Sequence, residues 1–144
     1  MSMPAVTVEV PSEENSTHAI TLGLREFNQR HIDVTPAEHF NVVLRDEDGT
    51  IVGGCACNTR WTWLYVDMLW VDERVRGRGF GTSLLQAAEA EATRRGCTKA
   101  YLDTISFQAK PFYESLGWTV FASQDDYPPG HTRFFLQKNL TPTS

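Results

Sequence analysis

The chain has 144 residues, a length that suits one domain built around one hydrophobic core. Hydrophobic residues make up 41% and charged residues 22%, and the formal net charge of −5 argues against a general nucleic-acid binder, whose surface is basic. No apolar run approaches the ~20 residues of a membrane span, and the opening MSMPAVTVEV shows no secretory signal. Three cysteines are too few for a disulfide framework. We therefore expect a cytoplasmic protein with no nucleic-acid partner and no membrane partner.

The predicted elements alternate between strand and helix patterns. Residues Ala5–Val10 alternate apolar and polar side chains, as a strand does. A helix is predicted over residues 12–30, with Ser12 as its capping residue. Residues 40–59 resemble a hairpin, because two apolar runs are joined by the turn signal DEDG. The long run Trp61–Val71 carries one charge and predicts a central strand covered on both faces.

The second half of the chain continues the alternation after a glycine-rich stretch. Its predicted elements are a helix over 82–95, a strand over 97–105, a short helix over 107–117, a strand over 118–123, a loop over 124–130 and a last strand over 131–140. Interleaved strands and helices with hairpins at both ends predict a single-domain α/β fold, with a mixed sheet and helices on its faces.

The stretch RVRGRGFGTSLL, Arg74–Leu85, sets three glycines among three arginines where a strand gives way to a helix. Backbone N–H groups at a helix N-terminus are unsatisfied and lie at the positive end of the helix dipole, so they suit phosphate oxygens. The spacing fits neither the dinucleotide fingerprint nor the P-loop. A diphosphate site opening the helix near Gly79 is the functional interpretation, and a tight turn with surface arginines is the alternative.

Two segments resemble signatures of the GNAT N-acetyltransferase superfamily. LWVDERVRGRGFGTSLL is similar to motif A, Arg/Gln-x-x-Gly-x-Gly/Ala, with Arg76, Gly79 and Gly81 at the motif positions. SFQAKPFYESLGW is similar to the second signature of the family, although Ser106 stands where asparagine is common. The resemblance covers about residues 61 to 121, and it implies a mostly antiparallel sheet with a central splay between two strands.

The resemblance also implies acetyl-coenzyme A as the donor of an acetyl group, an amine as its acceptor, and no metal. The transfer would be direct, within a ternary complex and without an acyl-enzyme. The residues it assigns to the coenzyme are Leu69, Trp70, Val71, Arg76, Gly77, Arg78, Gly79, Phe80, Gly81, Thr82, Ser106, Ala109 and Phe112.

Two residues are predicted to carry the chemistry. Tyr113 matches the tyrosine that protonates the departing thiolate in many members of the family, and a phenol is neutral at pH 7. Asp67 is the only charge in the long strand and is the candidate base. A strict period of two would place it on one face with Trp63, Tyr65, Leu69 and Val71. The alternatives are a core tyrosine and an exposed or hydrogen-bonded carboxylate.

The acceptor site is expected outside motif A. Aromatic faces and carboxylates suit an amine, and the candidate residues are Phe27, Asn28, Trp63, Tyr65, Asp103, Tyr127 and His131. A small-molecule primary amine is the predicted acceptor, and a homodimer is possible. A peptide or protein amine, an inactive acyl-coenzyme A-binding module and a nucleotide-binding domain are the alternatives. Cys55 and Cys57 lie two apart on a predicted strand and are expected to be small buried residues.

Overall fold

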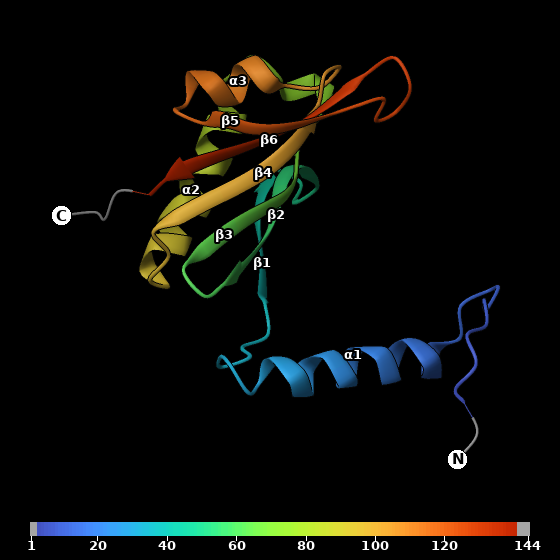
Figure 1. Cartoon of the computed structure of the whole chain (residues 1–144). Helices are drawn as coiled ribbons and strands as arrows, with labels where there is room; N and C mark the ends of the chain where they lie inside the picture. The colour runs from blue at the N-terminus through green and yellow to red at the C-terminus, as the bar shows by residue number, and fades with distance from the viewer. Residues whose placement is uncertain (1–2, 141–144) are drawn as a thin grey trace. The chain divides into compact units, whose positions relative to one another are not determined.

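The computed structural model describes residues 3–140 and divides into two compact units, residues 1–35 and 36–144, each described by itself. In the N-terminal unit, helix α1 runs from Glu14 to Asn28 (Figure 1). The prediction of a strand over Ala5–Val10 was wrong. Alternating side chains favour a strand only where a neighbouring strand can pair its backbone groups, and the sheet in the described chain joins strands of the other unit alone. That the whole chain is one domain stays a prediction.

Helix α1 begins one residue later than expected. Its N-cap is Glu13 rather than Ser12, and the Glu13 N–H donates to Glu9 Oε1 at 2.7 Å. The Ser16 hydroxyl donates to Glu9 Oε2 at 2.8 Å. The two bonds favour the ionised carboxylate, so the pKa of Glu9 is lowered, chiefly by the backbone N–H of Glu13.

Six strands form the sheet of the larger unit, in the order β1-β2-β3-β4-β6-β5 (Figure 1). Strands β3 and β4 are parallel, and every other pair of neighbours is antiparallel. The predicted mixed, mostly antiparallel sheet is thus confirmed. The strands are β1 Glu38–Arg45, β2 Ile51–Arg60, β3 Trp63–Val71, β4 Lys99–Ile105, β5 Thr119–Asp125 and β6 Thr132–Asn139.

Helices α2 (Phe80–Arg94) and α3 (Lys110–Ser115) contribute side chains to one buried cluster with the sheet. A short 3₁₀ helix, η1 (Glu73–Val75), connects β3 to α2. The largest fully buried side chains of the cluster are Trp118, Leu64, Leu85, Leu102, Leu136 and Cys55. That helices cover both faces of the sheet stays a prediction, because it depends on α1, which belongs to the other unit.

Strand β3 contains a β-bulge at Asp67. Val66 pairs with Cys57 and Met68 pairs with Ala56, so Asp67 is the extra residue between two consecutive positions of β2. A bulge shifts the alternation of a strand by one residue. Every side chain that follows it therefore points to the opposite face from the one that a strict period of two would assign.

The bulge overturns the predicted grouping of side chains along β3. Leu64 is buried before the bulge, and Leu69 and Val71 pack against the same core after it. Trp63 and Tyr65 alternate with Leu64 and so point to the other face. The prediction that these two aromatic residues share a face with Leu69 and Val71 was wrong, because the period of two is interrupted between them.

The face of β3 turned away from the core is open within this unit. Met68 is 62% exposed and Trp70 is 48% exposed; coverage of this face depends on α1, in the other unit, so a strand covered on both faces stays a prediction. The strand also begins at Trp63 and not at Trp61, because Trp61 has a φ of +54° in the turn that follows β2. No helix in the described part of the chain is long and apolar enough to cross a membrane.

Candidate active site

The glycine-rich segment opens helix α2, as predicted. Its N-cap Gly79 has a φ of +83° and Gly77 one of +78°, a left-handed conformation that favours glycine. Ser83 N–H donates to Gly79 O at 3.1 Å and begins the intrahelical ladder. The N–H groups of residues 80–82 precede that bond, and the first turn of a helix offers them no acceptor. The segment therefore presents donors at the positive end of the α2 dipole.

Gly81 brings the two predicted motifs together. A Cβ at this position would lie 3.2 Å from the ring of Phe112, a tight contact from which the ring would have to shift, so glycine favours the close approach of α2 to α3. The Phe112 ring in turn meets Tyr113 edge-on, with ring centroids 5.3 Å apart. The expected coenzyme-binding residues Gly81 and Phe112 are thus in contact, and they lie beside the expected acid.

The three arginines of the segment have different environments. Arg74 donates through Nε and Nη2 to the Asp72 carboxylate, at 3.0 Å each, and these bonds lower the pKa of Asp72 to about 2. Arg76 Nε donates to Val71 O at 2.9 Å and so ties the segment to the end of β3. Arg78 lines a surface hollow of about 450 Å³ beside the β1–β2 turn.

A cleft opens where β3 and β4 separate. The parallel pairing ends at Val66 and Leu102, although the strands continue to Val71 and Ile105. This confirms the predicted splay. The cleft has a volume of about 390 Å³ and is lined by Val66, Asp67, Met68, Leu69, Trp70, Leu102, Asp103, Thr104, Gln108, Ala109 and Tyr113. Five of the residues predicted for the coenzyme or the chemistry therefore share one cleft: Asp67, Leu69, Trp70, Ala109 and Tyr113.

Tyr113 joins the cleft to the core. The residue is 8% exposed, and its ring packs against Trp118 with centroids 6.3 Å apart. Burial raises the pKa of Tyr113 to about 12, with smaller contributions from Cys55 and Asp103. The phenol is therefore protonated throughout the neutral range and can donate a proton into the cleft.

Gln108 is a cleft residue that the sequence analysis missed. Its side-chain oxygen accepts bonds from the Ile105 N–H at 2.7 Å and from the Thr104 hydroxyl at 3.2 Å, which fixes the end of β4. A lone glutamine in a loop carries no pattern that would have identified it. Gln108 is close to β4 in the sequence, but its side chain reaches the strand only because of the conformation of the turn after Ile105, which the sequence does not reveal.

Asp103 lies at the centre of a polar network at the mouth of the cleft. Its Oδ1 accepts a hydrogen bond from the Tyr65 hydroxyl at 3.1 Å, and its Oδ2 accepts one from Arg133 Nε at 3.0 Å. Burial and the nearby carboxylate raise the pKa of Tyr65 to about 12. The Arg133 guanidinium also lies 4.7 Å from the centre of the Tyr127 ring. Three predicted acceptor residues are thus joined through Arg133, which the sequence analysis missed.

His131 lies beside Ser106 rather than in the Asp103 network. The Ser106 hydroxyl and His131 Nδ1 are 3.2 Å apart, and the same hydroxyl accepts a bond from the Thr132 N–H at 3.1 Å. Phe107 packs edge-on against the imidazole, with centroids 4.9 Å apart. Ser106 therefore anchors the beginning of β6, and its predicted contact with a coenzyme stays a prediction.

The remaining predicted residues lie elsewhere. Trp63 lines a second hollow on the open face of the sheet, with Tyr65. Phe27 and Asn28 end helix α1 in the other unit, so their part in an acceptor site stays a prediction. Cys55 and Cys57 are buried with their sulfur atoms 3.4 Å apart, which confirms them as small core residues. Among the described residues, no three His, Cys, Asp or Glu side chains gather as a metal site.

Comparison with known proteins agrees with this geometry. The chain is 40% identical over 110 residues to blasticidin-S acetyltransferase of Streptomyces morookaense, covering 76% of this chain and 81% of that protein. It is 33% identical over 129 residues to acetyltransferase Atu2258 of Agrobacterium fabrum, covering 90% and 94% of the two chains. The crystal structure of an acetyltransferase from Bacillus cereus is 31% identical and superposes with a TM-score of 0.85 over 93% of this chain and 98% of that one.

An aminoglycoside 6'-N-acetyltransferase solved with coenzyme A shares the fold, with a TM-score of 0.65 at 19% identity over 74% of this chain and 76% of that one. The model of the acetyltransferase (GNAT) family matches residues 7–118, which include the glycine-rich segment, both walls of the cleft and Tyr113. The chain therefore belongs to the GNAT family of acetyltransferases.

Proposed function

We propose that this acetyltransferase transfers an acetyl group from acetyl-coenzyme A to the primary amine of a small molecule, directly and within a ternary complex. The observation that carries the proposal is the cleft between β3 and β4, which has Asp67 in one wall and the Tyr113 phenol in the other. A carboxylate and a neutral phenol in one cleft are the two proton-transfer groups that acetylation of an amine requires.

The residues at the two ends of the cleft have separable tasks. The free N–H groups at the start of α2 suit the diphosphate of the coenzyme, and the open space around Gly79 leaves room for it. The splayed strands leave a gap of about 390 Å³ for the acetyl end. An N–H of Leu69 or Trp70 would stabilise the negative charge that develops on the carbonyl oxygen.

The proton movements follow from the same wall residues. Asp67, directly or through a water molecule, accepts the proton that leaves the amine as the new C–N bond forms. Tyr113 gives its proton to the sulfur as the C–S bond breaks. A pKa of about 12 keeps the phenol in its donating form at neutral pH. The phenol regains its proton from solvent after the products leave.

A small-molecule acceptor is favoured by the relative at 40% identity, which is a blasticidin-S acetyltransferase. The Asp67 carboxylate in the cleft also suits an acceptor that arrives as an ammonium ion and loses one proton before its neutral amine attacks the thioester. A donor-only protein would need neither carboxylate nor a protonated phenol.

The test is thiol release from acetyl-coenzyme A across a panel of small primary amines and N-terminal peptides, with product mass as the second measurement. Acetylated small amines, and no acetylated peptide, would support the proposal. Acetylated peptides alone would favour a peptide amine as the acceptor. Coenzyme binding by calorimetry with no transfer to any amine would indicate an inactive acyl-coenzyme A-binding module.

A further inference from the structure

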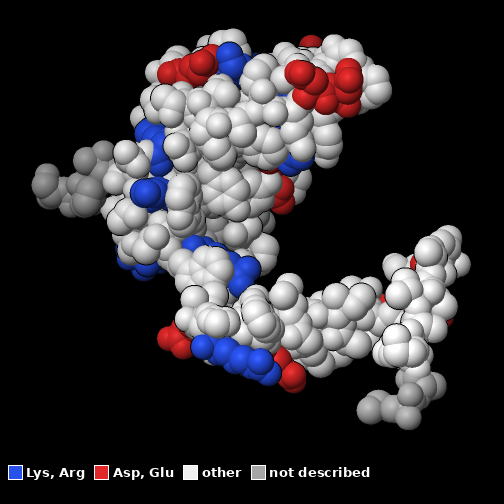
Figure 2. Space-filling model, in the orientation of Figure 1, with Lys and Arg blue, Asp and Glu red and all other residues white. Residues whose placement is uncertain are grey.

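A second hollow lies on the open face of the sheet, beside the cleft but outside it. It has a volume of about 380 Å³, within the range of small-molecule sites. Its lining consists of Asn58, Arg60, Trp61, Trp63, Tyr65, Tyr101, Phe121 and Gln137, and we call it the aromatic hollow. In the orientation of Figure 1, α2 lies behind the sheet, and Figure 2 shows that the middle of this face of the larger unit is largely without Lys, Arg, Asp or Glu.

The floor of the aromatic hollow is an ordered row across four strands. Asn58 of β2 is paired with Tyr65 of β3, Tyr65 with Tyr101 of β4, and Tyr101 with Gln137 of β6. Residues directly opposite each other point to the same face of a sheet. Two phenol rings are therefore flanked on each side by a carboxamide, a group that can both donate and accept hydrogen bonds.

The rings of this floor hold one another in place. Tyr65 and Tyr101 are stacked, with centroids 4.7 Å apart and planes inclined by 23°. Trp63 meets Tyr101 edge-on at 5.7 Å. Tyr101 is nevertheless 37% exposed, and Phe121, at the rim, is 51% exposed. The two stacked rings thus present their edges to the hollow, and a further flat ring can pack against them edge-to-face.

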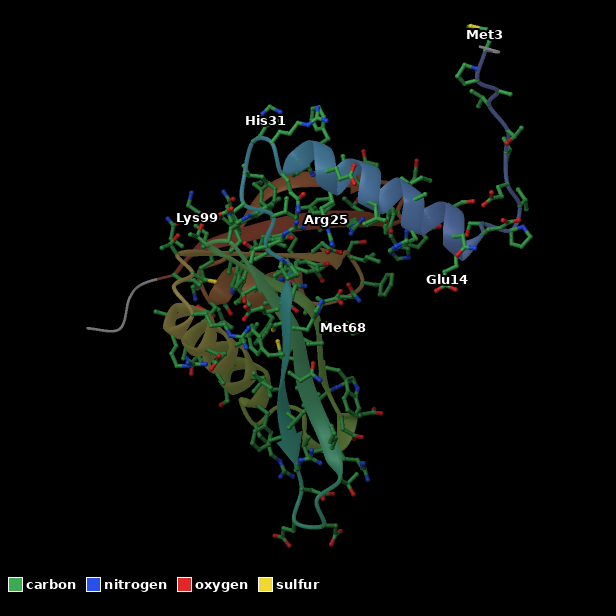
Figure 3. All side chains as sticks on the ribbon, turned by 90° about the horizontal axis from the view of Figure 1, so that it is seen from below. Met3, Glu14, Arg25, His31, Met68 and Lys99 are labelled. Atoms are coloured by element: carbon green, nitrogen blue, oxygen red, sulfur yellow. The ribbon has the colours of Figure 1, made fainter. Side chains whose placement is uncertain are left out.

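The aromatic hollow adjoins the cleft, and one hydrogen bond joins a residue of each. Tyr65 lines the hollow, and its hydroxyl donates to Asp103, which lines the cleft. Figure 3 shows Lys99 and Met68 well apart, and their sequence positions place them at the hollow end of β4 and the cleft end of β3. With a rise of about 3.3 Å per residue, the floor extends roughly 7 to 13 Å from the level of Asp103.

The charges at the two ends differ in sign. The carboxylates Asp67 and Asp103 lie at the cleft end, and Arg133 offsets one of them. At the hollow end, Lys99 lies over the Trp63 ring at 5.5 Å. None of the described residues that line the hollow is acidic. A second ammonium group would therefore be repelled there, and a neutral or anionic ring would not.

We infer that the aromatic hollow is an acceptor subsite for a flat ring with hydrogen-bonding edges, joined by a short chain to the amine that is acetylated. The ring packs over the edges of Tyr65 and Tyr101, its own edges bond to Asn58 and Gln137, and the chain passes Asp103 so that the amine reaches the cleft. This inference rests on the proposed function and names the class of acceptor. It excludes simple diamines and polyamines as preferred acceptors.

The test compares amines that share one chain: 1-(5-aminopentyl)uracil, 5-phenylpentylamine, pentylamine and 1,5-diaminopentane. A ring packed against aromatic side chains contributes about tenfold in kcat/KM, so we expect the uracil amine to exceed pentylamine by that factor, with 5-phenylpentylamine between them and the diamine lowest. In Tyr101→Leu the preference for a ring falls to near unity. In Gln137→Leu only the advantage of uracil over phenyl is lost.

Val120→Ala is the matched control, because Val120 lies on β5 outside the hollow and is 39% exposed. It leaves all four rates and their order unchanged. Equal kcat/KM values for ringed and ringless amines, or an equal loss for all four in Tyr101→Leu, would overturn the inference. Either result would show that the floor is a packing surface, for helix α1 or for a second copy of the chain.

Binding separates this inference from the proposed function. Tryptophan fluorescence, to which Trp61 and Trp63 contribute from the hollow, is titrated with the uracil amine without any coenzyme. Saturable quenching that is weakened at least fivefold in Tyr101→Leu supports the subsite, even if no acetyl group is transferred. Transfer to pentylamine with no quenching by the uracil amine overturns the subsite and leaves the proposed function standing.

Discussion

The sharpest test of the diphosphate site is a comparison of two glycines at opposite ends of helix α2. Gly79 is the N-cap with a φ of +83°, and Gly96 follows the C-terminus with a φ of +92°. A Cβ at either residue would meet no protein atom within 4 Å. Substitution by alanine therefore introduces the same kind of backbone strain at both positions and no steric clash at either.

The expected cost is about 1–2 kcal/mol for a non-glycine residue held in the left-handed region. For a chain of this size it corresponds to a fall in Tm of roughly 3–8 °C, and the fall is similar for Gly79→Ala and Gly96→Ala. The coenzyme distinguishes them. A methyl group at Gly79 takes up part of the open space in which we place the diphosphate, and the loss of one bond from an N–H to a charged oxygen costs about 1.5–3 kcal/mol.

The assay is titration calorimetry with coenzyme A, at a temperature at which both variants are folded. We expect Kd to rise roughly 10-fold to 150-fold in Gly79→Ala and by less than twofold in Gly96→Ala. Equal affinities in the two variants, with the matched loss of Tm present in both, would refute the placement of the diphosphate at this end of α2.

Three further predictions concern the cleft. Tyr113→Phe keeps the aromatic ring against Trp118, so the variant should remain folded. If the phenol is the acid, kcat measured by stopped-flow thiol release falls by ~10²–10⁴. An unchanged kcat would show that Tyr113 is not the acid. Because burial raises the pKa of Tyr113 from 10 to about 12, the unfolded chain ionises first, so stability is full below pH 10 and declines as the pH rises toward 12. Tyr65, whose pKa is also about 12, adds a loss of the same sign, so in urea unfolding the native protein should lose about 1 kcal/mol more between pH 9 and 11 than Tyr113→Phe does. Asp67→Asn should flatten the pH dependence of kcat/KM over the range in which the base ionises, and a profile identical to that of the native protein would exclude Asp67.

The residues that the sequence identified most securely were those whose conformation is set locally. Gly79 adopts a left-handed backbone conformation at the start of α2. The DEDG turn closes the β1–β2 hairpin through bonds from the N–H groups of Asp48 and Thr50 to the Asp46 carboxylate. Short-range spacing encodes such features. The family resemblance extended them to the splay and to the cleft, neither of which follows from spacing alone.

The errors arose where a residue's environment depends on another strand. The alternation along Trp61–Val71 contains no sign that Asp67 would be inserted against β2, because a bulge is a property of the pair. Likewise, Ala5–Val10 has the pattern of a strand but no partner in the described sheet. Arg133 was missed because only the pairing of β4 with β6 brings it opposite Ile105 and within reach of Asp103.

The early end of the β3–β4 ladder has a mechanical consequence. Within the sheet, strands β1-β2-β3 are joined to strands β4-β6-β5 by four residue pairs of β3 and β4, all at one end of these two strands. Beyond Val66 and Leu102, backbone groups of β3 and β4 that face each other are available to a ligand. A ligand that bonds to both strands would couple the two sets of three strands. Binding of a ligand in the cleft should therefore slow amide hydrogen exchange in residues 67–71 and 103–105 together, because the ligand would hold both strand ends in place.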